Sequence, residues 1–148
     1  GTNEINRFNV AHLLIRRARG GRLNVAQGTT VEAEVLSLLL QHFGETEPPQ
    51  EVLGALADLA AERYAAQANA GRMSAHSGGK ALRFEPVSRC YGAEHANRWW
   101  NAMSVVCSAC GDAGAAVWGR RKRPLDPDLV EAGRLVARMT TDAGGYPF

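Results

Sequence analysis

Apolar side chains recur at three- and four-residue steps along most of the chain, and this spacing predicts amphipathic helices. In residues 4–19 the side chains of Ile5, Phe8 and Ile15 fall on one face, and polar residues fill the remainder. Gly20 interrupts the pattern, so we expect the first helix to end there.

Two more helices are predicted before residue 71. Thr29 and Glu32 are spaced as a capping box, which predicts the start of a second helix, and Gly44 is placed to close it. A third helix is expected to begin at Pro48–Pro49, because proline is favoured in the first helical turn, and to run to about Ala70. The short connections indicate that these helices pack as antiparallel neighbours.

The pattern changes in residues 71–92, where glycine and proline recur. We expect an irregular segment there, with at most a short strand over residues 81–87. Helical spacing returns at Ala93 and includes two tryptophans before Gly111. A fifth helix is predicted after Asp126–Pro127, a favourable cap followed by a favourable first residue.

The predicted fold is therefore all-α, or nearly so. It has about five helices, arranged as an N-terminal three-helix unit, an irregular centre and a C-terminal helix pair. A length of 148 residues with 45% hydrophobic side chains is typical of one domain, which we place at residues 1–141 with a tail at 142–148. No apolar run approaches the roughly 20 residues that cross a bilayer, so no membrane association is expected.

Three cysteines suggest a metal site or a buried cluster. Cys90, His95, Cys107 and Cys110 are the soft or borderline ligands that tetrahedral zinc prefers, and Gly111 follows the C-x2-C pair as in a zinc knuckle. In the alternative interpretation, Cys107 and Cys110 share a helical stripe with the tryptophans and are ordinary buried thiols. Because an odd, small number of cysteines does not suit a secreted disulfide framework, we expect a reducing, cytoplasmic setting.

The net charge is only +2, but the basic side chains are clustered along the chain rather than evenly spread. Fifteen of the 17 basic residues are arginine, a side chain suited to bidentate recognition of phosphate. The basic residues that we assign to a nucleic-acid site form two clusters, Arg16, Arg17, Arg19 and Arg22, and Arg120, Arg121, Lys122 and Arg123. Trp118 lies close in sequence to the second cluster and is a candidate for stacking on an exposed base. The alternative is that they form solvated helix ends.

These features favour a non-enzymatic cytoplasmic protein that binds nucleic acid, or a nucleic-acid-associated protein, through its arginines. A second hypothesis is a protein-interaction or homo-oligomeric assembly module, which would expose a contiguous apolar patch. A third is an enzyme with its site in the central segment, near His76, Cys90, Glu94 or His95.

Overall fold

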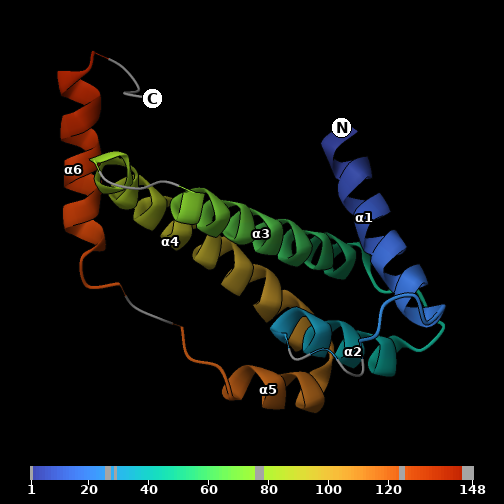
Figure 1. Ribbon diagram of the computed structural model, residues 1–148. Coiled ribbons are helices and arrows are strands. Elements are labelled where there is room, and N and C mark those ends of the chain that lie inside the picture. Colours follow the sequence, from blue (N-terminus) through green and yellow to red (C-terminus); the bar gives the residue numbers. More distant parts are fainter. Residues whose placement is uncertain (1, 26–27, 29, 76–78, 124–125, 145–148) are drawn as a thin grey trace. The chain divides into compact units, whose positions relative to one another are not determined.

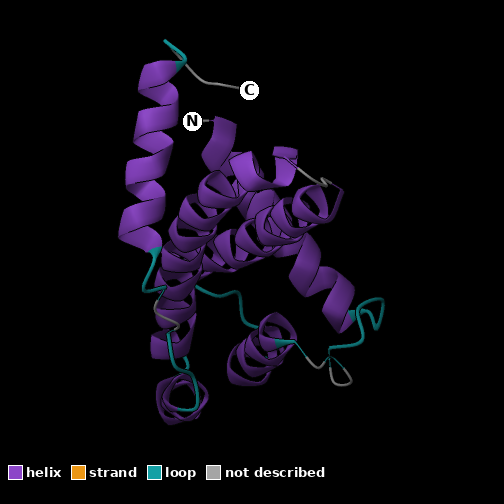
Figure 2. Cartoon of the chain, turned by 60° about the vertical axis from the view of Figure 1, so that its left-hand side comes forward, coloured by secondary structure: helices purple, strands orange, loops and turns teal. Residues whose placement is uncertain are grey.

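A computed structural model describes residues 2–25, 28, 30–75, 79–123 and 126–144, with the backbone alone for 79–83. All regular structure in this part of the chain is helical, as predicted, but it forms six helices rather than about five (Figures 1 and 2). The chain divides into two compact units, each described by itself. Unit 1 comprises residues 1–62 and 98–123, and unit 2 comprises residues 63–97 and 124–148.

Helix α1 (Thr2–Arg19) packs on unit 1 through Ala11 and Ile15, which are buried. It ends directly before Gly20, as predicted, and Gly21 lies in the left-handed region at φ 67°. The Arg22 amide turns back to donate to the Arg17 carbonyl at 2.8 Å, which is the pattern of a Schellman turn. The chain therefore turns back toward the helix directly after the basic end of α1.

Helix α2 (Val31–Phe43) begins at a threonine cap, one residue after the position predicted. The Thr30 hydroxyl accepts a hydrogen bond from the Ala33 amide at 3.2 Å, whereas Thr29 lies outside the described residues. The predicted stop is confirmed, because Gly44 adopts φ 54° and its amide donates to the Leu40 carbonyl at 2.9 Å.

Helices α3 (Gln50–Ala75) and α4 (Gly79–Ala109) correct the predicted centre of the chain. The expected irregular segment at residues 71–92 is helical wherever it is described, and the expected strand at 81–87 lies inside α4. A mid-helix glycine costs about 1 kcal/mol and a proline about 3, amounts that packing along a long helix offsets. Pro86, which is buried within α4, therefore does not end it.

Helix α5 (Gly111–Gly119) was not predicted, because its glycines and alanines give no clear apolar stripe. Gly111 adopts φ 58° and separates α4 from α5. A Cβ atom on Gly114 would collide with the backbone carbonyl of Cys107, so the two helices approach more closely than alanine permits.

Helix α6 (Leu129–Asp142) belongs to unit 2, where one guanidinium binds two carboxylates directly before its first turn. Arg89 lies 2.7 Å from Glu85 on its own helix, 3.3 Å from Asp126 and 2.9 Å from Asp128. Of the residues of α6, only Ala132 is buried. The predicted start of this helix is thus confirmed to within two residues.

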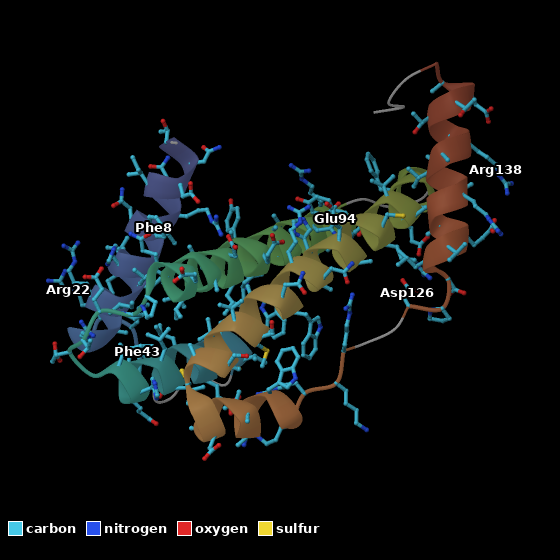
Figure 3. The ribbon with its side chains drawn as sticks, turned by 180° about the vertical axis from the view of Figure 1, so that it is seen from behind. Phe8, Arg22, Phe43, Glu94, Asp126 and Arg138 are labelled. Carbon is cyan, nitrogen blue, oxygen red and sulfur yellow. The ribbon has the colours of Figure 1, made fainter. Side chains whose placement is uncertain are left out.

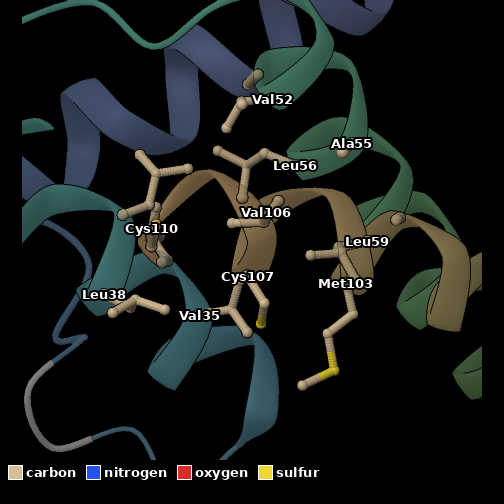
Figure 4. Packing of buried hydrophobic residues seen from close by; sticks show 14 of the residues in the cluster. Val35, Leu38, Val52, Ala55, Leu56, Leu59, Met103, Val106, Cys107 and Cys110 are labelled. Atoms are coloured by element: carbon tan, nitrogen blue, oxygen red, sulfur yellow. The ribbon is translucent and has the colours of Figure 1, made fainter. Parts of the chain in front are cut away.

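The described hydrophobic core lies almost entirely in unit 1. Residues from α1 to α5 contribute to it, and Leu39, Leu59, Met103, Val35 and Val106 are its largest fully buried side chains. Cys107 and Cys110, each 2% exposed, are part of this cluster (Figure 4). This packing fixes the end of α1 against α2 and thereby positions the basic residues described next.

Candidate functional site

Three arginines surround a hollow at the end of α1, which we call the basic hollow. It has a volume of about 480 Å³ and is lined by Leu13, Arg16, Arg17, Gly20 and Arg22. The first four recur at three- and four-residue steps, so they share one face of the helix. The turn at Gly21 adds Arg22, which Figure 3 shows at this end of α1.

The three guanidinium groups of the basic hollow are not neutralised within the described part of the chain. Arg16, Arg17 and Arg22 form no ion pair or side-chain hydrogen bond there. They are also not needed to cap α1, because the carbonyls of its last turn already accept from the amides of the following turn. Their positive charge is therefore presented to solvent around a concave surface.

Arg19 differs from its neighbours because it stabilises the end of α2. Its guanidinium donates to the Gly44 carbonyl and, at 3.3 Å, to the Thr46 carbonyl, and it lies 3.9 Å from the Glu45 carboxylate. A cation at the C-terminal end of a helix satisfies carbonyls that have no partner within the helix. Arg19 therefore acts in the fold, although the sequence placed it in the nucleic-acid site.

The second basic cluster is partly neutralised by a carboxylate that the sequence analysis missed. Arg120 lies 2.5 Å from Glu34, and Arg121 binds the other oxygen of the same group. The hydrogen bond from Arg121, followed by that from Arg120, lowers the pKa of Glu34. These contacts join residues 86 and 87 positions apart, for which local spacing gives no signal. Lys122 and Arg123 are exposed and unpaired in the described chain.

The two basic clusters contact opposite ends of α2. Arg19 binds residues that follow the last turn of α2, whereas Arg120 and Arg121 bind Glu34 in its first turn. Ten residues of α-helix separate these points by about 15 Å. One phosphate group is too small to bridge that distance, so the clusters do not form a single phosphate site.

The tryptophans lie close to the second cluster. Trp118 contacts Trp100 edge to face at 5.2 Å between ring centroids, and Trp100 contacts Trp99 in the same way at 5.3 Å. The Trp99 indole donates to a carboxylate oxygen of Glu32 at 3.0 Å. Trp118 remains 38% exposed, which leaves part of its ring accessible. Its main described contact is nevertheless with another tryptophan.

The residues of the predicted zinc site fall in different units. Cys107 and Cys110 are neighbours in unit 1, where burial raises the pKa of both thiols. Cys90 and His95 belong to unit 2 and lie five positions apart on α4, about 140° around the helix. Among the described residues, no three His, Cys, Asp or Glu side chains gather as a metal centre requires. Zinc binding stays a prediction that rests on the Cys107–Cys110 pair.

Three of the four central residues considered for catalysis, Cys90, Glu94 and His95, lie within two turns of α4. His95 is buried, and the centroid of its ring lies 3.9 Å from that of the Tyr91 ring. Glu94, which Figure 3 labels, is exposed. His76 lies outside the described residues.

None of the helices in the described part of the chain combines the length and apolar character needed to cross a bilayer. Comparison of the chain with protein-family models, curated proteins and solved structures finds no match. Its function therefore has to be argued from its own residues.

Proposed function

We propose that this protein binds nucleic acid, without catalysis, through the phosphate groups that Arg16, Arg17 and Arg22 recognise in the basic hollow. The observation that carries the proposal is that these arginines surround a concave surface and form no ion pair within the described chain. A guanidinium group with no acidic partner can bind a phosphate without first losing an internal contact. Leu13, which is 37% exposed, adds apolar surface for a sugar or base.

An extended polyanion suits this surface better than a single phosphate group. Lys122 and Arg123 carry further unpaired charge in the described chain, beside the residues that contact the other end of α2. The distance of about 15 Å between the two ends of α2 is spanned by several consecutive phosphates of a nucleic acid. In this proposal Arg120 and Arg121 have a structural role, since both bind Glu34.

The salt dependence of binding tests the proposal. Each phosphate contact releases counterions, so the logarithm of the affinity for a mixed pool of DNA and RNA should fall linearly with the logarithm of salt concentration. Changing Arg16→Gln and Arg17→Gln together should reduce that slope by about two units, because two contacts are lost. Fluorescence anisotropy with labelled oligonucleotides measures both quantities.

A matched control removes two arginines elsewhere. Arg134 and Arg138 are exposed on α6 and lie 3.5 and 3.6 Å from Glu131, and replacing both by glutamine changes the net charge equally. The control should change the slope by clearly less than the variant of the basic hollow. Equal changes would show that only net charge matters and would overturn the site.

The second hypothesis, an assembly module, predicts no binding to DNA or RNA. Wild-type protein that fails to bind DNA or RNA at low salt would overturn the proposal. In that case self-association, measured by sedimentation, becomes the property to examine. The exposed residues Val10 and Leu13 of α1 are the side chains whose replacement should then disrupt it.

A further inference from the structure

A second hollow lies in unit 2, and part of its lining comes from residues 71–92, which the sequence predicted to be irregular. It has a volume of about 570 Å³ and runs between α3 and α4. This volume falls in the range of roughly 300 to 1,000 Å³ that small-molecule sites occupy. Figure 1 shows the two helices side by side, and a hydrogen bond from Asn69 of α3 to Ser88 of α4 joins them here. We call this feature the α3–α4 groove.

The walls of the α3–α4 groove are mainly apolar and aromatic. Tyr64 and Met73 come from α3, and Phe84 and Tyr91 come from α4. Between them the small side chains Ala65 and Ala68 of α3 leave the space that forms the groove. Tyr64 and Tyr91 are 74% and 43% exposed, so a ligand has access to their rings from solvent. An aromatic or aliphatic body suits such walls.

A polar contact holds the two sides of the groove together. The Asn69 amide donates to the Ser88 carbonyl at 3.2 Å and to the Ser88 hydroxyl oxygen at 2.9 Å. Because that oxygen already accepts a hydrogen bond, the Ser88 hydroxyl hydrogen is left to donate. The groove thus contains a hydrogen-bond donor between its apolar walls.

One positive charge lies on the same face of α3. Arg72 lines the groove and forms no ion pair within the described chain. It follows Tyr64 by eight residues, which places its Cα about 12 Å further along the helix. An anionic group at Arg72 and an apolar body extending toward Tyr64 therefore match the length and the polarity of the groove.

We propose that the α3–α4 groove binds a small amphipathic organic anion, with its carboxylate or sulfonate at Arg72 and its apolar part between the aromatic side chains. This site is separate from the basic hollow in residues and in ligand. The aromatic contacts provide most of the affinity, and Arg72 selects the charged ligand over its neutral analogue.

Two fluorescent probes of similar shape test the site in the full chain. Anilinonaphthalenesulfonate carries a sulfonate, and N-phenylnaphthylamine is its neutral counterpart. The sulfonate should bind more tightly to wild-type protein. Arg72→Gln should weaken the sulfonate about fivefold, as expected for one exposed charge contact, and leave the neutral probe unchanged. Ala68→Phe fills the groove and should weaken both probes.

Two controls make the result decisive. Arg16→Gln with Arg17→Gln alters the basic hollow and should leave binding of both probes unchanged, and circular dichroism verifies that each variant remains folded. Equal affinity of the wild type for the two probes would overturn the proposal. So would a loss of sulfonate binding in the variant of the basic hollow that Arg72→Gln does not reproduce.

Discussion

A methyl group added at Gly114 should destabilise unit 1, although the same change normally stabilises a helix. The new Cβ atom would collide with the backbone carbonyl of Cys107. That oxygen already accepts a hydrogen bond from the Cys110 amide at 3.1 Å and belongs to the last turns of α4. No side-chain rotation relieves the contact, so α5 itself has to move.

The expected loss follows from two opposing terms. Alanine is favoured over glycine within a helix by about 1 kcal/mol. Overpacking a close contact costs about 1 to 3 kcal/mol, and here the displacement also loosens Val117, which is 6% exposed, and the contact of Trp118 with Trp100. Because the collision is with backbone rather than with a flexible side chain, we place the overpacking cost at about 2 to 3 kcal/mol. Subtracting the helix preference for alanine, we expect Gly114→Ala to lower the free energy of unfolding by about 1 to 2 kcal/mol.

Tryptophan fluorescence during urea unfolding measures this change directly, because Trp99, Trp100 and Trp118 are the three tryptophans of the chain and all lie in unit 1. Gly54→Ala is the matched control. Gly54 lies inside α3 in the same unit, and its added Cβ would meet only the flexible end of Arg7 at 3.5 Å, so it should stabilise by up to about 1 kcal/mol. A Gly114→Ala protein as stable as the wild type would refute the close packing of α5 on α4.

Three further predictions test the core and its charges. Leu56→Ala should cost about 2 to 5 kcal/mol in the same urea assay, because Leu56 is 4% exposed, and a loss below about 1 kcal/mol would place it outside the core. Burial raises the pKa of the Cys107 and Cys110 thiols, whereas Cys90 is only half-buried. An aromatic disulfide reagent should therefore modify Cys90 in native protein and the other two only in denaturant. Equal reaction rates of all three thiols in native protein would contradict this packing. Arg121 and Arg120 lower the pKa of Glu34, so its carboxylate stabilises the fold above its ordinary pKa of 4.5 and this contribution is lost as pH falls through the lower folded value. Stability measured from about pH 6 to 3 should therefore fall less steeply in Glu34→Gln than in the wild type.

The parts of the fold that follow local rules were predictable from the sequence. The stops at Gly20 and Gly44 and the start after Pro49 depend on residues adjacent in the chain, and the structure has them at those places. The first half of α4 was missed because Pro86 and its neighbouring glycines disfavour a helix locally, and only the surrounding packing reveals that they are tolerated.

The sequence predicted which arginines lie at the candidate site, but not which of them bind other parts of the chain and which remain unpaired among the described residues. Spacing alone identified the arginines at the end of α1. It did not separate Arg19, which binds the end of α2, from Arg16 and Arg17, which line the basic hollow. The pairing of Arg120 and Arg121 with Glu34 depends on tertiary contacts between distant parts of the chain. Assignments of this kind require the fold.

The attachment of α6 implies that this helix has a lower local stability than the helices of the core. Only Ala132 of this helix is buried, and Arg89 contacts Asp126 and Asp128 directly before its first turn. A helix with so little buried surface separates from its neighbours at a free energy well below that of global unfolding. Backbone amides of α6 should therefore exchange with deuterium much faster than those of α2, which buries Val35, Leu36, Leu38 and Leu39. A protease added to native protein should accordingly cleave first in α6.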